Sequence, residues 1–435
     1  MSKDRFFGRM NRLGLALTYD DVRLIPDQSE IMPKDTILES RFARRTPLRI
    51  PIVSAAMDTI TERKMGIAMA MFGGIGVIHR NLEPKQQASE VARVKHHLNA
   101  KIAKPITVFG DQTIGEIKKR RQDKGYSFQS FPVLDREEKV IGLLTRNDFS
   151  RCHNDLALAR DVMTPLQKLE TATAETNLDQ AYERLIHMRH NALPLIDKDG
   201  RLAGMFIFTD VKRIKLDEAS GYNLDMNSHL RVAAAIGTGE KELARAALLV
   251  QASVDALVID TAHGDSKFVY ETLAEVKKNW PYVDVVVGNV STGAAAERLA
   301  KAGADGIKVG QGPGSICTSR IMAGIGIPQI TAVYNCAAAI KKLGLDIPIC
   351  ADGGIKHPGD IPIAIGAGAH SVMLGNILAA THETPGEILI IGKHRWKIYR
   401  GMGSLEVLLE SEASRDRYQQ DLTSIEKIVP EGKKS

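Results

Sequence analysis

Eight short apolar runs recur along this chain, and their number is the feature that most restricts its fold. Each run is bounded by turn-forming residues, and most runs start 22 to 28 residues after the one before. The runs are Leu48–Val53, Gly74–His79, Arg231–Ile236, Asp255–Asp260, Val283–Gly288, Asp305–Gly310, Ile347–Ala351 and Ser371–Gly375. Helical patterns lie between them, as at Glu240–Gln251, Lys267–Asn279, Gly293–Ala302 and Tyr334–Leu343. Eight strands alternating with helices predict an α/β fold, a closed (β/α)8 TIM barrel, in preference to a doubly wound sheet.

Two long gaps interrupt this rhythm. The sixth and seventh runs start 42 residues apart, and a glycine-rich loop occupies the excess. The second and third runs start 157 residues apart. A helical pattern at Pro84–His97 completes the second unit. We therefore expect residues 101–222 to form an insert between two barrel segments, 1–100 and 223–435.

The insert contains an internal repeat at an offset of 62 residues. The matching pairs are Phe131–Asp135 with Leu193–Asp197, and Gly142–Asp148 with Gly204–Asp210. Each copy predicts a helix, two strands joined by a turn, and a second helix opened by an aspartate. The repeat therefore predicts that the insert forms two similar α+β modules, at 104–150 and 162–214.

These two modules resemble a tandem pair of cystathionine-β-synthase (CBS) modules. The resemblance implies an adenine or guanine nucleotide as ligand, with a Ser or Thr three residues before the aspartate contacting its ribose or phosphate. The first copy has this pair as Thr145 and Asp148, whereas the second has Ile207 before Asp210. The pattern is complete at one site only, and a spacer without a ligand is the alternative.

The composition is that of a soluble protein with more than one domain. Of 435 residues, 44% are hydrophobic, and no apolar run approaches the roughly 20 residues that span a bilayer. The N-terminus lacks the apolar segment of a secretory signal, and the four cysteines show no disulfide or zinc spacing. We therefore expect a cytoplasmic protein that does not bind membranes. A net charge of +6, spread along the chain, favours anionic small molecules over nucleic acid.

The loop after the sixth run reads Gly310-Gln-Gly-Pro-Gly-Ser-Ile-Cys-Thr-Ser-Arg320. Glycines at alternate positions (Gly310, Gly312 and Gly314) allow sharp turns and a close approach of the backbone to a ligand. Backbone N–H groups in such a loop can bind an anion, and Cys317 is a candidate nucleophile. An ordinary glycine-rich turn with an inert cysteine is the alternative.

Polar and glycine residues follow the seventh and eighth strands, where (β/α)8 barrels often bind phosphate. Strand seven ends with Asp352-Gly-Gly354, and strand eight with Gly375-Asn376. The glycines expose N–H groups, and Asp352 can accept hydrogen bonds from both hydroxyls of a ribose. With Ser315, these residues predict a site for a nucleoside monophosphate, and ordinary barrel turns are the alternative.

Strand four ends at Asp260 and strand five at Asn289, so both side chains are expected at the same mouth of the barrel. They are candidates to position a cofactor ribose and a reacting base. His263, just after strand four, is more typical of a structural hydrogen-bonding residue than of a base.

Glycines and charged residues continue beyond the eighth strand, outside the barrel rhythm. They include Tyr399–Ser404, the pair Arg417-Tyr418 and the segment Ile428–Gly432. This pattern is typical of a flexible lid over the barrel mouth. For Arg417 and Tyr418, a solvated surface pair is the alternative.

Several of these segments together resemble the inosine-5′-monophosphate (IMP) dehydrogenase family. The matching motifs are Val53–Thr59, Gly310–Arg320, Ala351–Gly354, Thr384–Glu387, Tyr399–Ser404 and Asp416–Tyr418. Their number and order make the resemblance specific from about Leu17 to Gly432. It implies an oxidoreductase of guanine nucleotide biosynthesis, built as a (β/α)8 barrel with a CBS insert.

The resemblance assigns a role to each candidate residue. IMP would contact Ser315, Asp352, Gly353, Gly354, Gly375, Asn376, Tyr399, Gly401, Met402, Gly403 and Glu431. NAD would lie near Asp260, Asn289 and Gly310. The carbonyl groups implied to bind K⁺ are those of Gly312, Gly314 and Cys317. A homotetramer is also implied, with an octamer as the alternative.

The resemblance further implies covalent chemistry at Cys317. Its thiolate would attack C2 of the base, a hydride would pass to NAD, and a thioimidate would remain. The lid would then enter the space left by NADH. Arg417 would act as the general base that activates water, assisted by Tyr418 and the hydroxyl of Ser319, and xanthosine monophosphate (XMP) would be released.

Four features depart from the family pattern. Ser319 occupies a position where the family usually has Thr, and it keeps the hydroxyl. Asn376 lies where a Ser is common, and Gln419 lies where a Phe is common. The chain ends at Ser435, whereas family members continue for several tens of residues. Because that tail completes the lid and supplies K⁺ ligands to a neighbouring subunit, we expect weaker lid closure and cation binding. A slow steady state after a burst of NADH is the expected consequence.

Two other functions stay open. GMP reductase shares the barrel and the cysteine but uses NADPH and releases ammonia. The pair Arg417-Tyr418 argues against it, because the reductase needs no hydrolytic lid. A nucleotide-binding regulatory protein without turnover would bind IMP and adenine nucleotides yet produce no NADH.

Overall fold

The computed structural model describes residues 3–98, 101–102, 104–124, 126, 130–188, 190–215, 221–418 and 429–434. The chain divides into two compact units. The first, the barrel unit, comprises Met1–His97, Gly221–Asp225 and Leu230–Ser435. The second, the insert unit, comprises Leu98–Ser220 and Met226–His229. Among the described helices, none combines the length and hydropathy needed to cross a bilayer.

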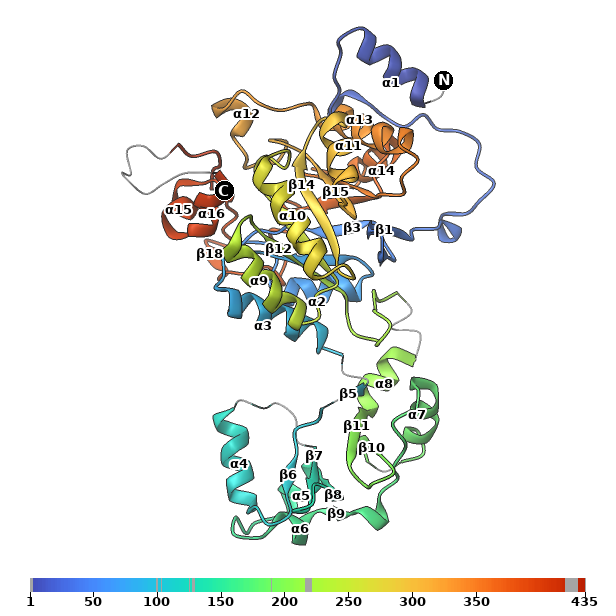
Figure 1. The fold of residues 1–435 in the computed structure, drawn as a ribbon, viewed down its shortest axis with the longest axis vertical. Coiled ribbons are helices and arrows are strands. Elements are labelled where there is room, and N and C mark those ends of the chain that lie inside the picture. The colour runs from blue at the N-terminus through green and yellow to red at the C-terminus, as the bar shows by residue number, and fades with distance from the viewer. Residues whose placement is uncertain are drawn as a thin grey trace. The chain divides into compact units, whose positions relative to one another are not determined.

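The barrel unit is built on eight parallel strands that close in the order β12-β13-β14-β15-β16-β17-β3-β4 (Figure 1). Their bounds are β3 (Ile52–Ser54), β4 (Ile75–Ile78), β12 (Val232–Ile236), β13 (Ala256–Asp260), β14 (Asp284–Val290), β15 (Gly306–Val309), β16 (Ile349–Asp352) and β17 (Ser371–Leu374). All seven residues of β14 are buried, as expected for parallel strands that are covered on both faces. The prediction of a closed (β/α)8 barrel is confirmed.

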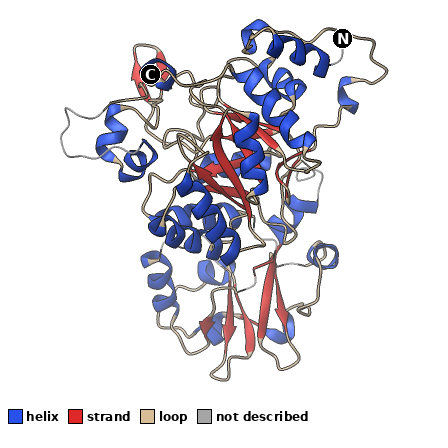
Figure 2. Ribbon diagram, turned by 45° about the horizontal axis from the view of Figure 1, so that its top comes forward, coloured by secondary structure: helices blue, strands red, loops and turns tan. Residues whose placement is uncertain are grey.

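Helices surround this sheet, as Figure 2 shows by colour. They are α2 (Arg63–Met71), α3 (Pro84–Lys95), α9 (Glu240–Gln251), α10 (Lys267–Asn279), α11 (Gly293–Lys301), α13 (Gln329–Lys342) and α14 (Asp360–Ala367). The predicted helices at 240–251 and 267–279 have the expected bounds. The helix predicted from Tyr334 starts earlier, at Gln329, because the chain after the cysteine loop enters the helix directly behind Pro328.

The first predicted strand needs a correction. Leu48 does not belong to the barrel but ends β2 (Thr46–Leu48), which pairs antiparallel with β1 (Ser40–Ala43). The barrel strand begins only at Ile52. Phe42 and Leu48 are buried and pack in one cluster with the apolar side chains inside the barrel. Apolar character therefore continues from the hairpin into the strand, and the pattern alone could not divide them.

Further elements of the barrel unit lie outside the eight repeats. They are α1 (Lys3–Arg12), η1 (Tyr19–Asp21), η2 (Pro33–Asp35), α12 (Ser319–Met322), β18 (Leu389–Ile391), β19 (His394–Trp396), α15 (Leu405–Glu410) and α16 (Glu412–Tyr418). The last two helices, together with residues 399–404 and 429–432, belong to the predicted lid. Gln419 and Ile428, which the sequence placed in the same lid, lie outside the described residues.

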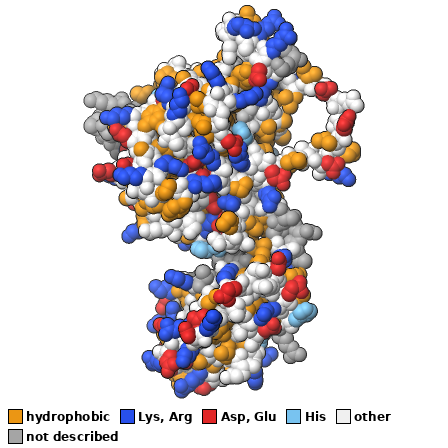
Figure 3. All heavy atoms as spheres, turned by 45° about the vertical axis from the view of Figure 1, so that its right-hand side comes forward, with side chains coloured by type: hydrophobic (Ala, Val, Ile, Leu, Met, Phe, Trp, Pro, Cys, Tyr) orange, Lys and Arg blue, Asp and Glu red, His pale blue; other side chains and the backbone are white. Residues whose placement is uncertain are grey.

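The insert unit contains two small sheets, in the orders β6-β7-β8-β9 and β10-β11-β5. Its strands are β5 (Lys101–Ile102), β6 (Val108–Phe109), β7 (Phe131–Leu134), β8 (Val140–Leu144), β9 (Thr164–Pro165), β10 (Ala192–Ile196) and β11 (Leu202–Ile207). Its helices are α4 (Ile114–Asp123), α5 (Arg146–Arg151), α6 (Ala159–Val162), η3 (Leu166–Lys168), α7 (Leu178–Leu185) and α8 (Phe208–Lys215). On the face drawn in Figure 3, basic and acidic side chains are interspersed on both units.

The two repeated segments of the insert each form a helix, a hairpin and a second helix, as their patterns predict. Neither aspartate opens its helix, however. Asp148 and Asp210 occupy the third positions of α5 and α8. In α5 the residue before the helix is Thr145, which forms a capping box with Asp148, so the aspartate binds back onto the helix start.

Candidate functional site

A cavity of about 660 Å³ opens at the carboxyl ends of the barrel strands. It is lined by every barrel residue that the sequence nominated for catalysis or for binding. These are Asp260, Asn289, Gly310, Gly312, Gly314, Ser315, Cys317, Ser319, Asp352, Gly353, Gly354, Gly375, Asn376, Tyr399, Gly401, Met402, Gly403, Arg417, Tyr418 and Glu431. The fold thus brings together loops that lie up to 171 residues apart in the sequence, from Asp260 to Glu431.

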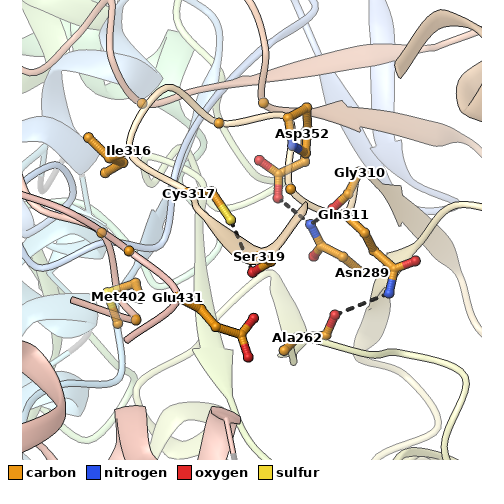
Figure 4. A pocket seen from close by; sticks show the side chains of 18 of the residues that line it. Ala262, Asn289, Gly310, Gln311, Ile316, Cys317, Ser319, Asp352, Met402 and Glu431 are labelled. Atoms are coloured by element: carbon orange, nitrogen blue, oxygen red, sulfur yellow. Dashed lines mark hydrogen bonds between the residues drawn. The ribbon is translucent and has the colours of Figure 1, made fainter. Parts of the chain in front are cut away.

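The cysteine loop packs closely against the end of β16. Gly310 has φ +149°, and a Cβ there would lie 2.1 Å from the carbonyl oxygen of Asp352, so only glycine fits. The Cys317 thiol is partly buried and donates to Ser319 Oγ at 3.2 Å (Figure 4). The loop therefore presents a free thiol to the cavity with a hydroxyl beside it.

Residues 429–434 run between the cysteine loop and the loop at 401–403. The Thr318 N–H donates to the Glu431 carbonyl at 2.9 Å, and the Lys433 N–H donates to the Ile316 carbonyl at 2.9 Å. On the other side, the Glu431 N–H donates to the Gly403 carbonyl at 3.0 Å. This strand-like pairing carries the Glu431 side chain into the cavity, where Figure 4 shows it near Ser319.

The carboxylate of Asp352 is held by two donors on neighbouring strands. Asn289 Nδ2 donates to Asp352 Oδ2 at 2.9 Å, and Lys308 Nζ lies 2.6 Å from the same oxygen. Asn289 Nδ2 also donates to the Gly310 carbonyl at 2.6 Å, which ties the start of the cysteine loop to this cluster. The arrangement leaves Asp352 Oδ1 available to a ligand in the cavity.

Arg417 of α16 reaches across the cavity and forms an ion pair with Asp260 at the end of β13. The side chains are 14% and 4% exposed, so the solvated surface pair considered from the sequence is excluded for Arg417. Burial alone would raise the pKa of Asp260, but Arg417 and Lys308 outweigh it and hold that pKa below its usual range. Burial likewise opposes the Arg417 charge, yet Asp260 raises the pKa of the guanidinium.

Tyr418 packs against the loop that follows the eighth strand. A Cβ at Gly403 would lie 2.7 Å from the Tyr418 ring carbon Cζ, so the glycine makes room for the ring. Burial raises the pKa of Tyr418 to about 12, although Arg417 opposes the shift. The phenol is therefore neutral, and able to donate or to accept a hydrogen bond, at neutral pH.

Comparison with known proteins decides the family. The profile described as "IMP dehydrogenase / GMP reductase domain" matches residues 16–435. The chain belongs to this family. The resemblance inferred from the motifs is thereby confirmed, together with the expectation of an enzyme of this family.

Curated members of the IMP dehydrogenase / GMP reductase family match over nearly the whole chain. Inosine-5′-monophosphate dehydrogenase of Aquifex aeolicus is 46% identical over 419 residues, which covers 96% of this chain and 83% of the relative. The enzyme of the same name from Helicobacter pylori (strain 26695) is 45% identical over 425 residues, with 97% and 85% coverage. A solved GMP reductase variant from Trypanosoma brucei, bound to guanosine 5′-monophosphate, has a TM-score of 0.86 at 34% identity. That match covers 97% of this chain and 86% of the other.

Two residues that line the cavity of this IMP dehydrogenase / GMP reductase chain were not predicted from the sequence. Lys308 lies within an apolar strand and contacts both Asp260 and Asp352. Gln311 donates to the Ala262 carbonyl at 3.2 Å and accepts a bond from Ser291 Oγ at 2.6 Å. A charged residue inside an otherwise apolar strand was the available signal for Lys308, whereas nothing local marked Gln311.

The candidate residues of the insert do not belong to this cavity. Thr145 Oγ1 donates to Asp148 Oδ2 at 2.7 Å, and the Thr145 N–H donates to the same oxygen at 2.7 Å. Asp210 lies in the first turn of α8, in the second repeat. The binding of a nucleotide by these residues stays a prediction.

Proposed function

We propose that this chain catalyses the NAD-dependent oxidation of IMP to XMP through a covalent bond to Cys317. One observation carries the proposal: the thiol, the carboxylate of Asp352 and the pair Arg417-Tyr418 line one cavity. Curated relatives at 43–46% identity bear the name inosine-5′-monophosphate dehydrogenase, which supports the same reaction.

The phosphate of IMP would bind among the loops that follow β16 and β17, with Ser315, Gly354 and Asn376. A Cβ at Gly375 would lie 2.9 Å from the hydroxyl of Tyr399, so glycine keeps that hydroxyl accessible. Burial raises the pKa of Tyr399 to about 12. At neutral pH the phenol therefore keeps its proton, and its O–H can donate a hydrogen bond to a phosphate oxygen.

The ribose would bind to Asp352. Since Oδ2 is held by Asn289 and Lys308, the ribose hydroxyls would donate to Oδ1. The purine would then lie toward Cys317, between Met402 and Glu431, and Glu431 would contact its amide. Cys317, Met402 and Glu431 all line the cavity.

In the first chemical step the sulfur of Cys317 would form a bond to C2 of the purine, and the thiol proton would leave. NAD, held near Asp260, Asn289 and Gly310, would supply the acceptor for the hydride that leaves C2. The thiolate is the nucleophilic form of cysteine. In this structure the thiol donates to Ser319 Oγ, and as a thiolate it would accept a bond from that hydroxyl instead. Ser319 is therefore suited to both states of the sulfur.

The cofactor side of the cavity is formed by the ends of β13 and β14 and by the cysteine loop. Asp260, Asn289 and Gly310 lie there together, and the Oδ1 atom of Asp260 is buried without a hydrogen bond beyond its ion pair. A buried carboxylate beside open space suits the hydroxyls of a ribose. In this structure Arg417 forms an ion pair with Asp260. We therefore propose that the lid and the cofactor bind this carboxylate alternately.

Hydrolysis would complete the reaction. Water would add to C2, the carbon–sulfur bond would break, and XMP would leave. Arg417 and Tyr418, which line the cavity beside Cys317, would activate this water. Asp260 stabilises the charged guanidinium in the closed lid, so Arg417 would gain basicity only on moving away from that partner.

We also propose that K⁺ stabilises the cysteine loop through the carbonyls of Gly312, Gly314 and Cys317. The Gly314 carbonyl accepts the Cys317 N–H at 3.1 Å, which leaves a second lone pair for a cation. In the described part of the chain, no group of three or more His, Cys, Asp or Glu side chains could hold a metal ion. The proposed cation therefore relies on backbone oxygens.

For the insert, we propose that an adenine or guanine nucleotide binds through Thr145 and Asp148 and, in the second repeat, Asp210.

We further propose that the chain forms a homotetramer. The hairpin of β18 and β19 supports assembly because it exposes large apolar side chains, with Ile390 74% and Trp396 56% exposed. Exposed apolar clusters of this kind are typical of protein interfaces.

GMP reductase is the second candidate, because solved structures with that name match at 34–35% identity. The buried position of Arg417 beside Tyr418 favours the dehydrogenase, which has a hydrolytic step to catalyse.

The test measures NADH formation from IMP and NAD, with and without K⁺, and compares it with NADPH oxidation in the presence of GMP. NADH formation that K⁺ accelerates is expected. NADPH oxidation with GMP would replace the proposal, and binding of IMP without any turnover would indicate a regulatory protein.

A further inference from the structure

Lys308 lies inside the barrel, where its ammonium group contacts both candidate ligand-binding carboxylates. The residue is 1% exposed. Its Nζ lies 2.9 Å from Asp260 Oδ1 and 2.6 Å from Asp352 Oδ2, and it also donates to Asn289 Oδ1. No step of the proposed reaction uses this amine.

Space for this side chain is built into the neighbouring strand. Gly288 of β14 is paired in register with Lys308 of β15. A Cβ at Gly288 would lie 2.6 Å from the Cβ of Lys308, so the glycine allows the lysine to enter the barrel at this height. The lysine is thus accommodated at the level of the two carboxylates.

The charges around Lys308 form a balanced chain of four. Arg417 pairs with Asp260, Asp260 with Lys308, and Lys308 with Asp352. Burying a charge is costly unless an opposite charge and hydrogen bonds compensate it. Without Lys308, the buried Asp260 and the partly buried Asp352 would share one cation, Arg417 of the lid.

Each carboxylate contacts Lys308 through one oxygen, and Asp352 Oδ2 also accepts a hydrogen bond from Asn289. Asp260 places Oδ1 on Lys308 and Oδ2 on Arg417. Asp352 places Oδ2 on Lys308 and keeps Oδ1 for the cavity. A single ammonium group therefore orients both carboxylates.

We propose that Lys308 is a positioning residue that orients Asp352 for the nucleotide ribose and Asp260 for the cofactor and the lid. It thereby makes the two ligand sites depend on one buried charge. The proposal rests on the proposed function, which assigns Asp352 to the ribose and Asp260 to the cofactor. Its consequence is that loss of this one amine weakens both ligands together, although neither ligand needs to touch it.

The test replaces Lys308 by methionine, which keeps an unbranched chain and removes the charge. We expect the dissociation constant for IMP, measured by titration calorimetry, and the KM for NAD each to rise about tenfold or more. Lys308→Arg, which keeps the charge, should recover most of the IMP affinity. Unchanged IMP affinity in a folded Lys308→Met protein would overturn the proposal.

Lys95 offers a matched control. It is also 1% exposed and pairs with two carboxylates, Asp225 at 2.7 Å and Asp255 at 2.8 Å, but it does not line the cavity. Lys95→Met should lower the unfolding temperature as Lys308→Met does, while both ligand constants stay within about twofold of wild type. Equal ligand effects in both variants would mean that Lys308 acts only through general stability.

A second comparison keeps the test decisive if Lys308→Met does not fold. The double variant Lys308→Met/Asp352→Asn removes one charge of each sign from this cluster. Its KM for NAD should exceed that of Asp352→Asn alone by about tenfold, because Asp260 has lost its second partner. Equal values in the two proteins would refute the coupling.

Failure of the proposed function would look different. A wild-type protein that makes no NADH from IMP and NAD but oxidises NADPH with GMP would refute the dehydrogenase. The calorimetric comparison of wild type with Lys308→Met would then use GMP, and a weakening of about tenfold would still support the role of Lys308.

Discussion

Arg417 on α16 and Asp260 at the end of β13 form a largely buried ion pair across the mouth of the barrel. The pair joins the described part of the lid to the strand end where a cofactor ribose is proposed. One carboxylate can serve only one of these partners at a time. The pair therefore provides a structural basis for alternation between cofactor binding and lid closure at this carboxylate.

The first prediction concerns Arg417. Arg417→Ala should leave the pre-steady-state burst of NADH intact and lower the steady-state rate by about a hundredfold or more, because hydrolysis then limits turnover. Stopped-flow absorbance of NADH measures both phases. Lys241→Ala is a suitable control, since Lys241 and Glu412 form an exposed ion pair at the lid and its loss should change neither phase. Equal loss of burst and steady state in Arg417→Ala would show that Arg417 serves structure or cofactor binding instead.

The second prediction concerns Asp352. Removing its charge-assisted hydrogen bonds to a ribose should cost about 1.5–3 kcal/mol, which weakens IMP binding roughly tenfold to a hundredfold in Asp352→Ala. Equilibrium titration with IMP measures the effect. Asp346→Ala serves as the control, because Asp346 pairs with Arg41 at the surface and its side chain is 77% exposed. An Asp352→Ala protein with wild-type IMP affinity would place the nucleotide elsewhere.

The third prediction uses thiol reactivity and pH. Burial raises the pKa of Cys336 and of Cys350 to about 12. A raised pKa means that the proton is held more tightly, so at pH 8 roughly one of these thiols in ten thousand is a thiolate. Iodoacetamide should therefore label the partly buried Cys317 and Cys152 before the two buried cysteines, whose labelling should increase only as the pH rises toward 12.

Added IMP should protect Cys317 from this label, and peptide mass spectrometry locates the modified residues. Cys317→Ala should still bind IMP, because the proposed phosphate and ribose contacts lie on other residues, but it should not form NADH. Normal turnover by Cys317→Ala would exclude covalent catalysis at this position. Fast labelling of Cys350 in folded protein at pH 8 would contradict its burial within the barrel.

The fourth prediction concerns Gly403. Since a Cβ there would meet the Tyr418 ring at 2.7 Å, Gly403→Ala should displace Tyr418 and slow the steady state by roughly tenfold while the burst survives. Gly359→Ala is the matched control, because its φ is −64° and no atom lies within 4 Å of an added Cβ. If the two alanine variants turned over equally fast, the position of Tyr418 would not matter for hydrolysis.

Much of the barrel follows from local pattern. Parallel strands buried on both faces require continuous apolar runs, and the helices between them require an apolar stripe, so eight repeats could be counted from residue order alone. The glycines of the cysteine loop could also be recognised, because close backbone approach admits no other residue at Gly310. These features depend on neighbours in sequence, so the order of residues is enough to predict them.

Contacts between distant segments were decided by the tertiary structure. Lys308 looks like an isolated charge in an apolar strand, and only closure of the barrel places Asp260 and Asp352 on either side of it. Glu431 reaches the cavity only because its backbone pairs with Thr318 and Gly403. The physical reason is that local propensity acts over a few residues, whereas charge compensation and strand pairing depend on which segments the completed fold brings within hydrogen-bonding distance.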